Sequence, residues 1–139
     1  MENLGVAIIG CGAIHNVHID AIKNNGMGRI LWFVDIQEER AKASAQKHGG
    51  NWCTDYQRVL EDPKVDVLHI CTPHYLHAQM AIDATNAGKH AFVEKPAAIN
   101  LETARVMAEA AKKNNKIITI CFQNRYNPTS IRAKEIIES

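Results

Sequence analysis

Residues 5–14 read Gly-Val-Ala-Ile-Ile-Gly-Cys-Gly-Ala-Ile, and this stretch decides how the chain is expected to fold. Its first half is a short, continuously apolar run, which is typical of a strand covered on both faces. Gly10-Cys11-Gly12 follows at once and opens a segment in which apolar residues recur at helical spacing. The stretch therefore predicts a strand, a tight glycine turn and a helix, in that order.

The same alternation of apolar runs and helical patterns continues along the chain. The predicted strands are Gly5–Ile9, Ile30–Val34, Val65–Cys71, His90–Val93 and Lys116–Phe122. The predicted helices are Ala13–Asn25, Glu38–Gly49, Asp55–Leu60, Leu76–Gly88, Leu101–Asn114 and Pro128–Ile137. Repeated strand–helix units require right-handed crossovers, which place helices on both faces of a parallel sheet. The sequence therefore predicts an α/β fold with a doubly wound parallel sheet.

Length and composition fit one ordinary globular domain. The 139 residues include 46% hydrophobic ones, and 16 Lys and Arg nearly balance 15 Asp and Glu. This balance argues against nucleic acid or a membrane surface as a partner. No apolar run approaches the ~18–20 residues that span a bilayer, and no basic stretch opens a signal peptide, so we expect a cytoplasmic protein. The four cysteines form no C-x-x-C pair, and no disulfide is expected.

The glycine turn has the context of a phosphate-binding loop. Gly10 permits the tight turn, and Gly12 lets the backbone approach a pyrophosphate, toward which the amides of Ala13 and Ile14 point from a helix N-terminus. The alternative is a strand–helix turn without a ligand. Asp35 ends the second strand 23 residues after Gly12, close to the ~20-residue interval of a carboxylate that binds the adenosine ribose.

The acid after the second strand favours NAD over NADP. A 2′-phosphate beside Asp35 brings like charges within ~4 Å, at a cost of roughly 1–4 kcal/mol. Arg40, one turn into the next helix, is the cation that would offset this cost, although a solvated helix residue is the plainer interpretation. We therefore expect NAD as the cofactor and keep NADP as the alternative.

Two further motifs follow predicted strands, at the edge where open α/β sheets bind ligands. They are Thr72-Pro73 and Glu94-Lys95-Pro96. A lysine beside a nicotinamide can donate a hydrogen bond to a substrate hydroxyl or carbonyl oxygen. The alternative for Lys95 is an exposed lysine at the end of a strand.

Taken together, these motifs resemble the nucleotide-binding half of the glucose–fructose oxidoreductase/inositol dehydrogenase (Gfo/Idh/MocA) family. The segments that carry the resemblance, in family order, are Gly10–Ile14 with His18, Val34-Asp35, Thr72-Pro73 with His77, Ala87–His90, Glu94–Pro96 and Phe122–Pro128. The resemblance implies a Rossmann-like fold and NAD(P)-dependent oxidation or reduction of a sugar, a polyol or a related secondary alcohol.

The resemblance also implies roles for individual residues. Lys95 faces the nicotinamide and the reacting substrate oxygen as the catalytic residue, and Glu94 binds the nicotinamide ribose. The pyrophosphate and the adenosine ribose are bound by Gly10, Gly12, Ala13, Ile14 and Asp35. The remaining residues assigned to the cleft are Thr72, Pro73, His77, Gln123 and Arg125.

The sequence departs from the family pattern at two histidines and in length. His15 replaces a small residue, and we expect its side chain to push the first helix off the sheet or to turn toward solvent; His74 stands where Asn is frequent.

Members of the family continue into a second α/β domain that supplies most of the substrate pocket and mediates oligomerisation. We therefore expect a dinucleotide-binding domain at 1–126 and the start of a connector helix at 127–139. The chain as given is expected to bind nucleotide without catalysing turnover.

Three alternatives to a dehydrogenase domain make different demands on the sequence. His15/His18 and His74/His77 have i, i+3 spacing, but two histidines are too few for structural zinc and no other ligand lies at suitable spacing, so no metal is predicted. His69 is expected to be a core residue. A non-catalytic dinucleotide-sensing module is the main alternative. A methyltransferase also uses a glycine loop and an acid after the second strand, but the Glu94–Pro96 motif argues against it.

Overall fold

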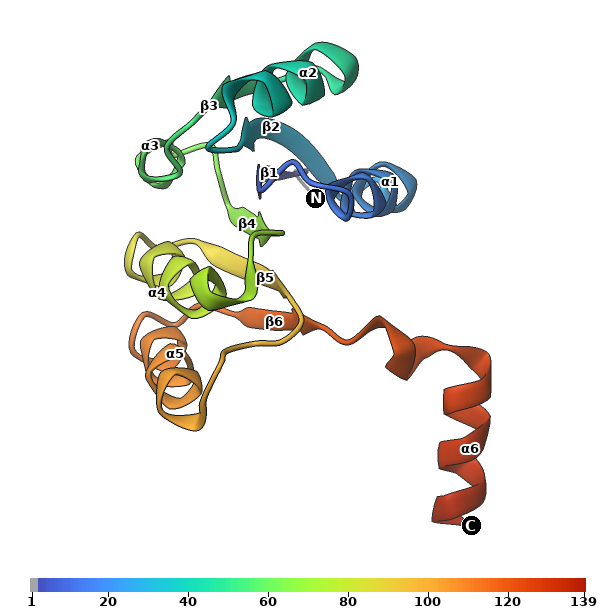
Figure 1. Cartoon of the computed structure of the whole chain (residues 1–139). Coiled ribbons are helices and arrows are strands. Elements are labelled where there is room, and N and C mark those ends of the chain that lie inside the picture. The colour runs from blue at the N-terminus through green and yellow to red at the C-terminus, as the bar shows by residue number, and fades with distance from the viewer. Residues whose placement is uncertain (1–2) are drawn as a thin grey trace.

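The computed structural model describes residues 3–139 and contains one six-stranded parallel sheet with strand order β3-β2-β1-β4-β5-β6 (Figure 1). The strands are β1 Leu4–Ile9, β2 Gly28–Val34, β3 Asn51–Cys53, β4 Val67–Ile70, β5 His90–Glu94 and β6 Ile118–Cys121. The helices are α1 His15–Asn25, α2 Glu38–His48, α3 Gln57–Leu60, α4 His77–Asn86, α5 Leu101–Lys113 and α6 Pro128–Glu138, with 3₁₀ turns at His74–Leu76 and Gln123–Tyr126. The predicted doubly wound α/β fold is confirmed.

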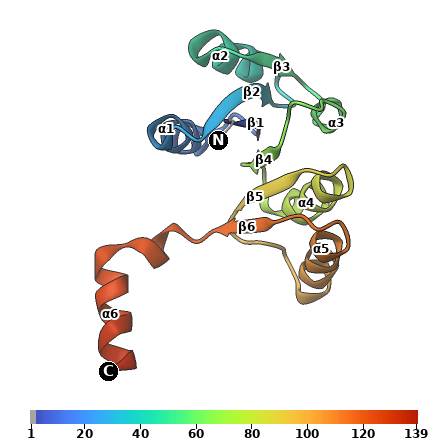
Figure 2. The same ribbon diagram turned by 180° about the vertical axis from the view of Figure 1, so that it is seen from behind.

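The apolar run of β1 packs against both layers of helices. Val6 and Ile8 belong to a core that includes Ile19 of α1, while Ala7 and Ile9 belong to a second core that includes residues of α4 and α5. All four β1 residues are almost completely buried. Figure 2 shows the two layers from behind, with α1 and α2 on one side and α4 and α5 on the other. This arrangement explains why the strand is continuously apolar rather than alternating.

Strand β3 is the one element of the sheet that the sequence analysis missed. It has three residues, Asn51–Cys53, and pairs only with β2 at the edge of the sheet. Asn51 and Trp52 are exposed, so no apolar run marks the strand. The helix ends carry ordinary capping residues: Gly49 follows α2 with φ of 80°, and the Asn100 side chain caps α5 by accepting a hydrogen bond from the Thr103 amide.

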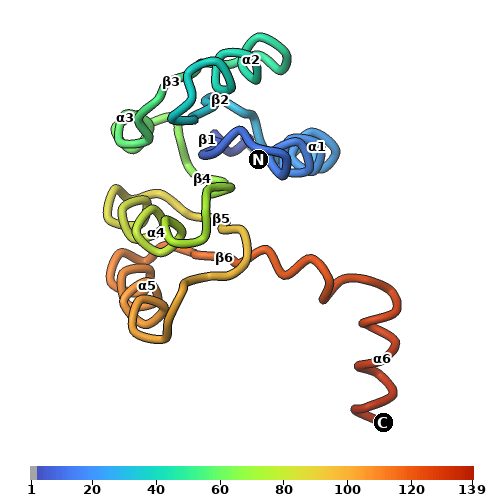
Figure 3. Tube along the Cα trace, in the orientation of Figure 1, coloured from blue at the N-terminus to red at the C-terminus, as the bar shows by residue number. Residues whose placement is uncertain are grey.

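The last helix, α6, projects away from the sheet (Figure 3). Its main contact is with the 3₁₀ turn that precedes it, and Ile131, Ile136 and Ile137 are exposed. Exposed apolar side chains on a helix indicate a face that is suited to packing against further protein. Across residues 3–139, the helices are all too short or too polar to cross a membrane.

The start of β1 lies so close to the segment before β4 that only glycine fits at residue 5. A Cβ atom added to Gly5 would lie 1.8 Å from the Lys64 carbonyl oxygen, and the Gly5 amide donates to Asp66 at 2.7 Å. Gly5→Ala is therefore expected to lower the free energy of unfolding by about 3 kcal/mol, as an overpacked core does. Urea denaturation measures this loss. Gly12→Ala is the matched control, because no atom lies within 4 Å of a Cβ there; equal midpoints for Gly5→Ala and the unchanged chain would contradict this packing.

Candidate nucleotide-binding site

The site is built where β1 and β4 end side by side, at the point where the strand order reverses. Gly10 has φ of 95°, and its amide donates to the Val34 carbonyl at 2.7 Å. A Cβ at Gly10 would lie 2.8 Å from the Cys71 carbonyl oxygen, so the two strand ends nearly touch there. Gly12, by contrast, faces open space. The backbone of Gly12 is therefore accessible to a ligand at the N-terminus of α1.

Asp35 connects the end of β2 to the glycine turn. One carboxylate oxygen accepts a hydrogen bond from the Cys11 amide at 2.8 Å, and the other accepts from the Gln37 amide at 2.8 Å. These bonds fix the carboxylate beside the glycine turn, and the side chain remains partly exposed. The structure thus brings together Asp35 and Gly10-Cys11-Gly12, as the spacing predicted.

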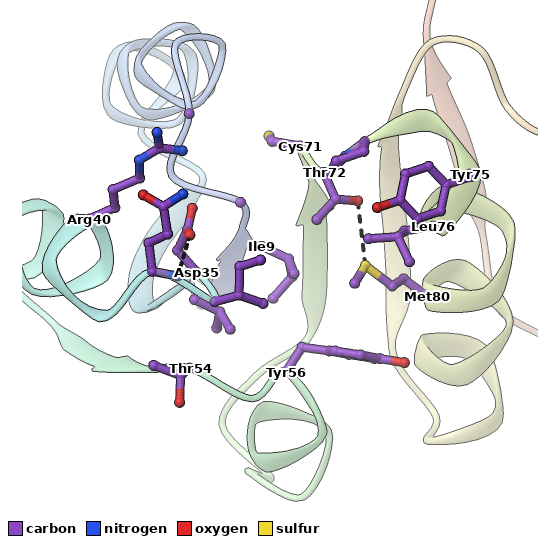
Figure 4. A pocket seen from close by; sticks show the side chains of 16 residues that line it. Ile9, Asp35, Arg40, Thr54, Tyr56, Cys71, Thr72, Tyr75, Leu76 and Met80 are labelled. Carbon is purple, nitrogen blue, oxygen red and sulfur yellow. Dashed lines mark hydrogen bonds between the residues drawn. The ribbon is translucent and has the colours of Figure 1, made fainter.

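A cavity of about 430 Å³ lies beside this carboxylate. Figure 4 shows Asp35 and Arg40 on one side of it, and Thr72, Tyr75 and Leu76 on the other. Gly10, Gly12 and Pro73 also line it. The cavity therefore has polar groups and a cation at the β2 end and an apolar wall at the β4 end, an arrangement suited to a planar base attached to a ribose.

The motif after β5 lies at the same edge of the sheet as the glycine turn, because β1 and β5 are parallel and both end there. Lys95 is exposed and lines a shallow hollow of about 370 Å³ together with Gln123 and Arg125. Gln123 also borders an adjoining apolar hollow that Ile14, at the start of α1, and Glu94 line. The structure thus brings the predicted Lys95, Gln123 and Arg125 together.

Glu94 is largely buried and is hydrogen-bonded within the chain, although it borders the apolar hollow. Only 8% of the residue is exposed, and its carboxylate accepts hydrogen bonds from His18 Nε2 at 2.9 Å and from the Lys95 amide at 3.2 Å. Burial opposes ionisation, but the hydrogen bonds from His18, Cys121 and the Lys95 amide outweigh it, and the pKa of Glu94 is lower than its ordinary value. Glu94 is therefore an ionised, hydrogen-bonded residue beneath Lys95.

His18 joins Glu94 to His69 in a short chain of hydrogen bonds. His18 Nδ1 lies 3.0 Å from His69 Nδ1, and burial, followed by the nearby His18, lowers the pKa of His69 to about 4. His69 is thus neutral at pH 7 and can donate to His18, which donates to Glu94. His69 is hydrogen-bonded but only partly buried, and it borders the apolar hollow rather than lying in the core as expected.

The same cluster gathers potential metal ligands that the sequence spacing did not indicate. Ligand atoms of His18, Glu94 and Cys121 lie within 4.8 Å of one another. They come from α1, β5 and β6, so no local pattern could have revealed the group. Both ring nitrogens of His18 are already hydrogen-bonded, and burial raises the pKa of the Cys121 thiol. These contacts account for the cluster as a hydrogen-bond network.

Two histidines lie differently from their predictions. His15 does not turn to solvent: it is buried, Nδ1 contacts the Gly12 carbonyl, and Nε2 lies 3.0 Å from Ser44 Oγ on α2. His77 does not line the cavity wall, because it is completely buried at the start of α4. The small side chain of Ser44 leaves space for the His15 ring. The His77 ring lies between the carbonyl oxygens of Thr72 and Pro96.

A glycine turn before α1, an acid after β2 and a cavity at the reversal of strand order define a dinucleotide-binding α/β fold. Residues 4–122 match an oxidoreductase family with an NAD-binding Rossmann fold, GFO_IDH_MocA. The chain belongs to this family, as the sequence motifs predicted, and corresponds to its NAD-binding domain.

Relatives cover the whole chain but are much longer. An uncharacterized oxidoreductase, YrbE, of Bacillus subtilis is 35% identical over 99% of this chain and 41% of its own length. The levoglucosan dehydrogenase of Pseudarthrobacter phenanthrenivorans is 32% identical over 99% of this chain and 38% of its own length. A crystal structure of the WlbA dehydrogenase of Chromobacterium violaceum with NADH and UDP-GlcNAcA has a TM-score of 0.94, 29% identity, and coverage of 99% of this chain and 40% of that one. The chain thus spans about 40% of the length of these relatives.

Proposed function

We propose that this chain is the nucleotide-binding half of an NAD-dependent dehydrogenase that acts on a sugar, a polyol or a related secondary alcohol. The observation that carries the proposal is the position of two groups at one edge of the sheet: the open backbone of Gly12 and the ammonium group of Lys95. A dinucleotide that crosses the reversal point would meet both. The names of the relatives, which include levoglucosan and inositol dehydrogenases, support the substrate class.

The residues would share the work as follows. Gly10, Gly12, Ala13 and Ile14 would hold the pyrophosphate with backbone amides at the N-terminus of α1, and Asp35 would accept hydrogen bonds from the adenosine ribose. The cavity walls and the rim near the nicotinamide would be formed by Thr72, Pro73, Gln123 and Arg125. Glu94 would bind the nicotinamide ribose, and its hydrogen bonds from His18 and from the Lys95 amide would hold the carboxylate in place.

Lys95 would act on the substrate oxygen. When bound, the nicotinamide supplies the hydride acceptor or donor. Lys95 would donate a hydrogen bond to the alcohol or carbonyl oxygen, which stabilises negative charge as it develops there. A second domain would supply the base for proton transfer. It would also hold the reacting carbon at roughly 3–3.5 Å from the nicotinamide.

The proposed function also implies a domain boundary near the end of the chain. We propose that residues 1–126 form the nucleotide-binding unit and that 127–139 begin a connection to a substrate-binding domain. The exposed isoleucines of α6 support this, because they form an apolar face with few contacts to the rest of the chain. Oligomerisation through that second domain and a cytoplasmic location complete the proposal.

The cofactor preference tests the proposed function on the chain itself. We expect NADH to bind about tenfold more tightly than NADPH, because Asp35 repels a 2′-phosphate. Asp35→Asn should narrow this difference, since the amide oxygen still accepts a hydrogen bond but carries no charge. Fluorescence titration with each nucleotide measures both affinities. Glu39→Gln, an exposed acid on α2, is the control and should leave the ratio unchanged. Tighter binding of NADPH would show instead that Arg40 decides the preference.

A further inference from the structure

Strands β4 and β5 are well covered on only one of their two faces. The residues of these strands that share a core with α4 and α5 are almost completely buried: Leu68, Ile70, Ala91 and Val93. The residues that alternate with them on the opposite face, Val67, His69 and Phe92, are only partly buried. Parallel sheets are normally covered by helices on both faces, as β1 is here. Within residues 3–139, the α1 face of β4 and β5 is therefore incompletely covered.

This incompletely covered face forms the apolar hollow. Helix α1 packs chiefly on β2, and a hollow of about 410 Å³ remains between α1 and the partly buried side chains of β4 and β5. Val17 and Ala21 line it from α1, and Val67 and Phe92 line it from the strands. Val17 is 61% exposed. A continuous apolar surface of this kind is suited to burial against further protein.

The polar groups that line the hollow already have hydrogen-bond partners. His18 lies 2.9 Å from the Glu94 carboxylate and 3.0 Å from His69. Throughout residues 3–139, every buried side-chain nitrogen and oxygen atom has a hydrogen-bond partner. The hollow therefore matches an apolar surface better than a charged ligand.

Two observations favour a further part of the same protein over a second copy of this chain. The chain spans 41% and 38% of the length of its Bacillus and Pseudarthrobacter relatives, so more than half of each relative lies outside the matched segment. In Figures 1 and 2, α6 leaves the sheet toward the side on which α1 lies, while α4 and α5 lie on the other side. A chain that continues from α6 would therefore start on the side of the hollow.

We propose that the apolar hollow is the docking surface for an amphipathic helix from the part of the protein that follows α6. Such a helix would lie beside α1 and complete the helical layer that α1 and α2 begin, with its apolar side against Val17 and Phe92. The proposal rests on the proposed function in one respect, because both take the chain as part of a longer dehydrogenase. Glu94 and Gln123 also border the hollow, so the docked helix would fix the second domain next to Lys95.

A charge placed in the hollow tests the proposal. Val17→Glu should leave the stability of the chain itself unchanged, because the side chain is exposed and an acid suits the first turn of α1. In the complete dehydrogenase the docked helix would bury this carboxylate without a partner, which should lower the thermal midpoint by about 5–10 °C. Thermal unfolding followed by circular dichroism measures both proteins.

Val106→Glu is the matched control. Val106 is an exposed valine on α5, outside the hollow, and its substitution should leave both midpoints unchanged. Equal midpoints for Val17→Glu and Val106→Glu in the complete dehydrogenase overturn the proposal. A lower midpoint for Val17→Glu in the chain itself would assign the hollow to α6 or to a second copy, and it overturns the proposal as well.

A milder pair of variants covers the case in which Val17→Glu prevents the complete dehydrogenase from folding. Val17→Ala should then lower its thermal midpoint by about 2 °C, and Val106→Ala should not. Equal midpoints for this pair overturn the proposal. These measurements use no nucleotide, so absence of NADH binding contradicts the proposed function alone and leaves the docking surface to be decided by the midpoints.

Discussion

Replacing Lys95 by alanine in the complete dehydrogenase is expected to lower turnover by about 10²–10³-fold, because a group that stabilises charge in the transition state is lost. NADH affinity should change by less than about threefold, since Lys95 acts on the substrate oxygen rather than on the pyrophosphate. Its exposure at the rim, outside the buried cores, means that stability should stay the same. Steady-state kinetics together with NADH titration separate the two effects.

The control for this substitution removes a lysine of the same kind elsewhere. Lys113 lies at the end of α5 and is exposed. Lys113→Ala removes one positive charge without touching the site, and it should leave both turnover and affinity unchanged. Equal losses of turnover and NADH affinity in Lys95→Ala would place the lysine on the nucleotide and contradict the assigned role.

Gly12→Val should abolish measurable NADH binding while the chain stays folded. The glycine faces open space, with no atom within 4 Å of a Cβ, so a side chain costs little in the free chain. A pyrophosphate that approaches the backbone would occupy that same space. We expect a loss of affinity of about 10²-fold or more. Fluorescence titration measures the affinity, and urea denaturation measures the stability.

A control variant distinguishes loss of NADH binding at Gly12 from the general effect of replacing an exposed glycine. Gly26 closes α1 at the opposite edge of the sheet, with φ of 66° and no atom near its Cβ position. Gly26→Asn tolerates this φ and should leave NADH binding intact. Unchanged binding in Gly12→Val would mean that the glycine turn does not contact the nucleotide.

Local patterns were sufficient to predict the doubly wound sheet. β1 was predicted because its residues are buried on both faces, which makes the run continuously apolar, and α5 was predicted from its helical spacing of apolar residues. β3 left no such signal, because a three-residue edge strand has little apolar surface to bury. Pairing with β2 stabilises β3 more than side-chain burial does, and such backbone pairing leaves no apolar pattern in the sequence.

Within the site, groups on one loop were predictable and groups joined across the fold were not. The glycine turn and Asp35 follow from spacing along the sequence. The buried positions of His15 and Glu94 depend on Ser44 and His18, which lie 29 and 76 residues away in sequence. His77 depends on two backbone carbonyls, which leave no trace in residue type. Side-chain orientation at these positions is decided by tertiary contacts, which periodicity does not encode.

The central claim is that one dinucleotide contacts the glycine turn and the Lys95 turn together. Titrating NADH into the ¹⁵N-labelled chain and following its backbone amide signals tests this most directly. We predict that the amide signals of Gly12, Ala13, Ile14 and Lys95 shift along one saturation curve. The amide signals of Gly26, Gly49 and Gly88, at the other edge of the sheet, should not shift. Shifts confined to that other edge, or shifts of Gly12 without Lys95, would contradict the account.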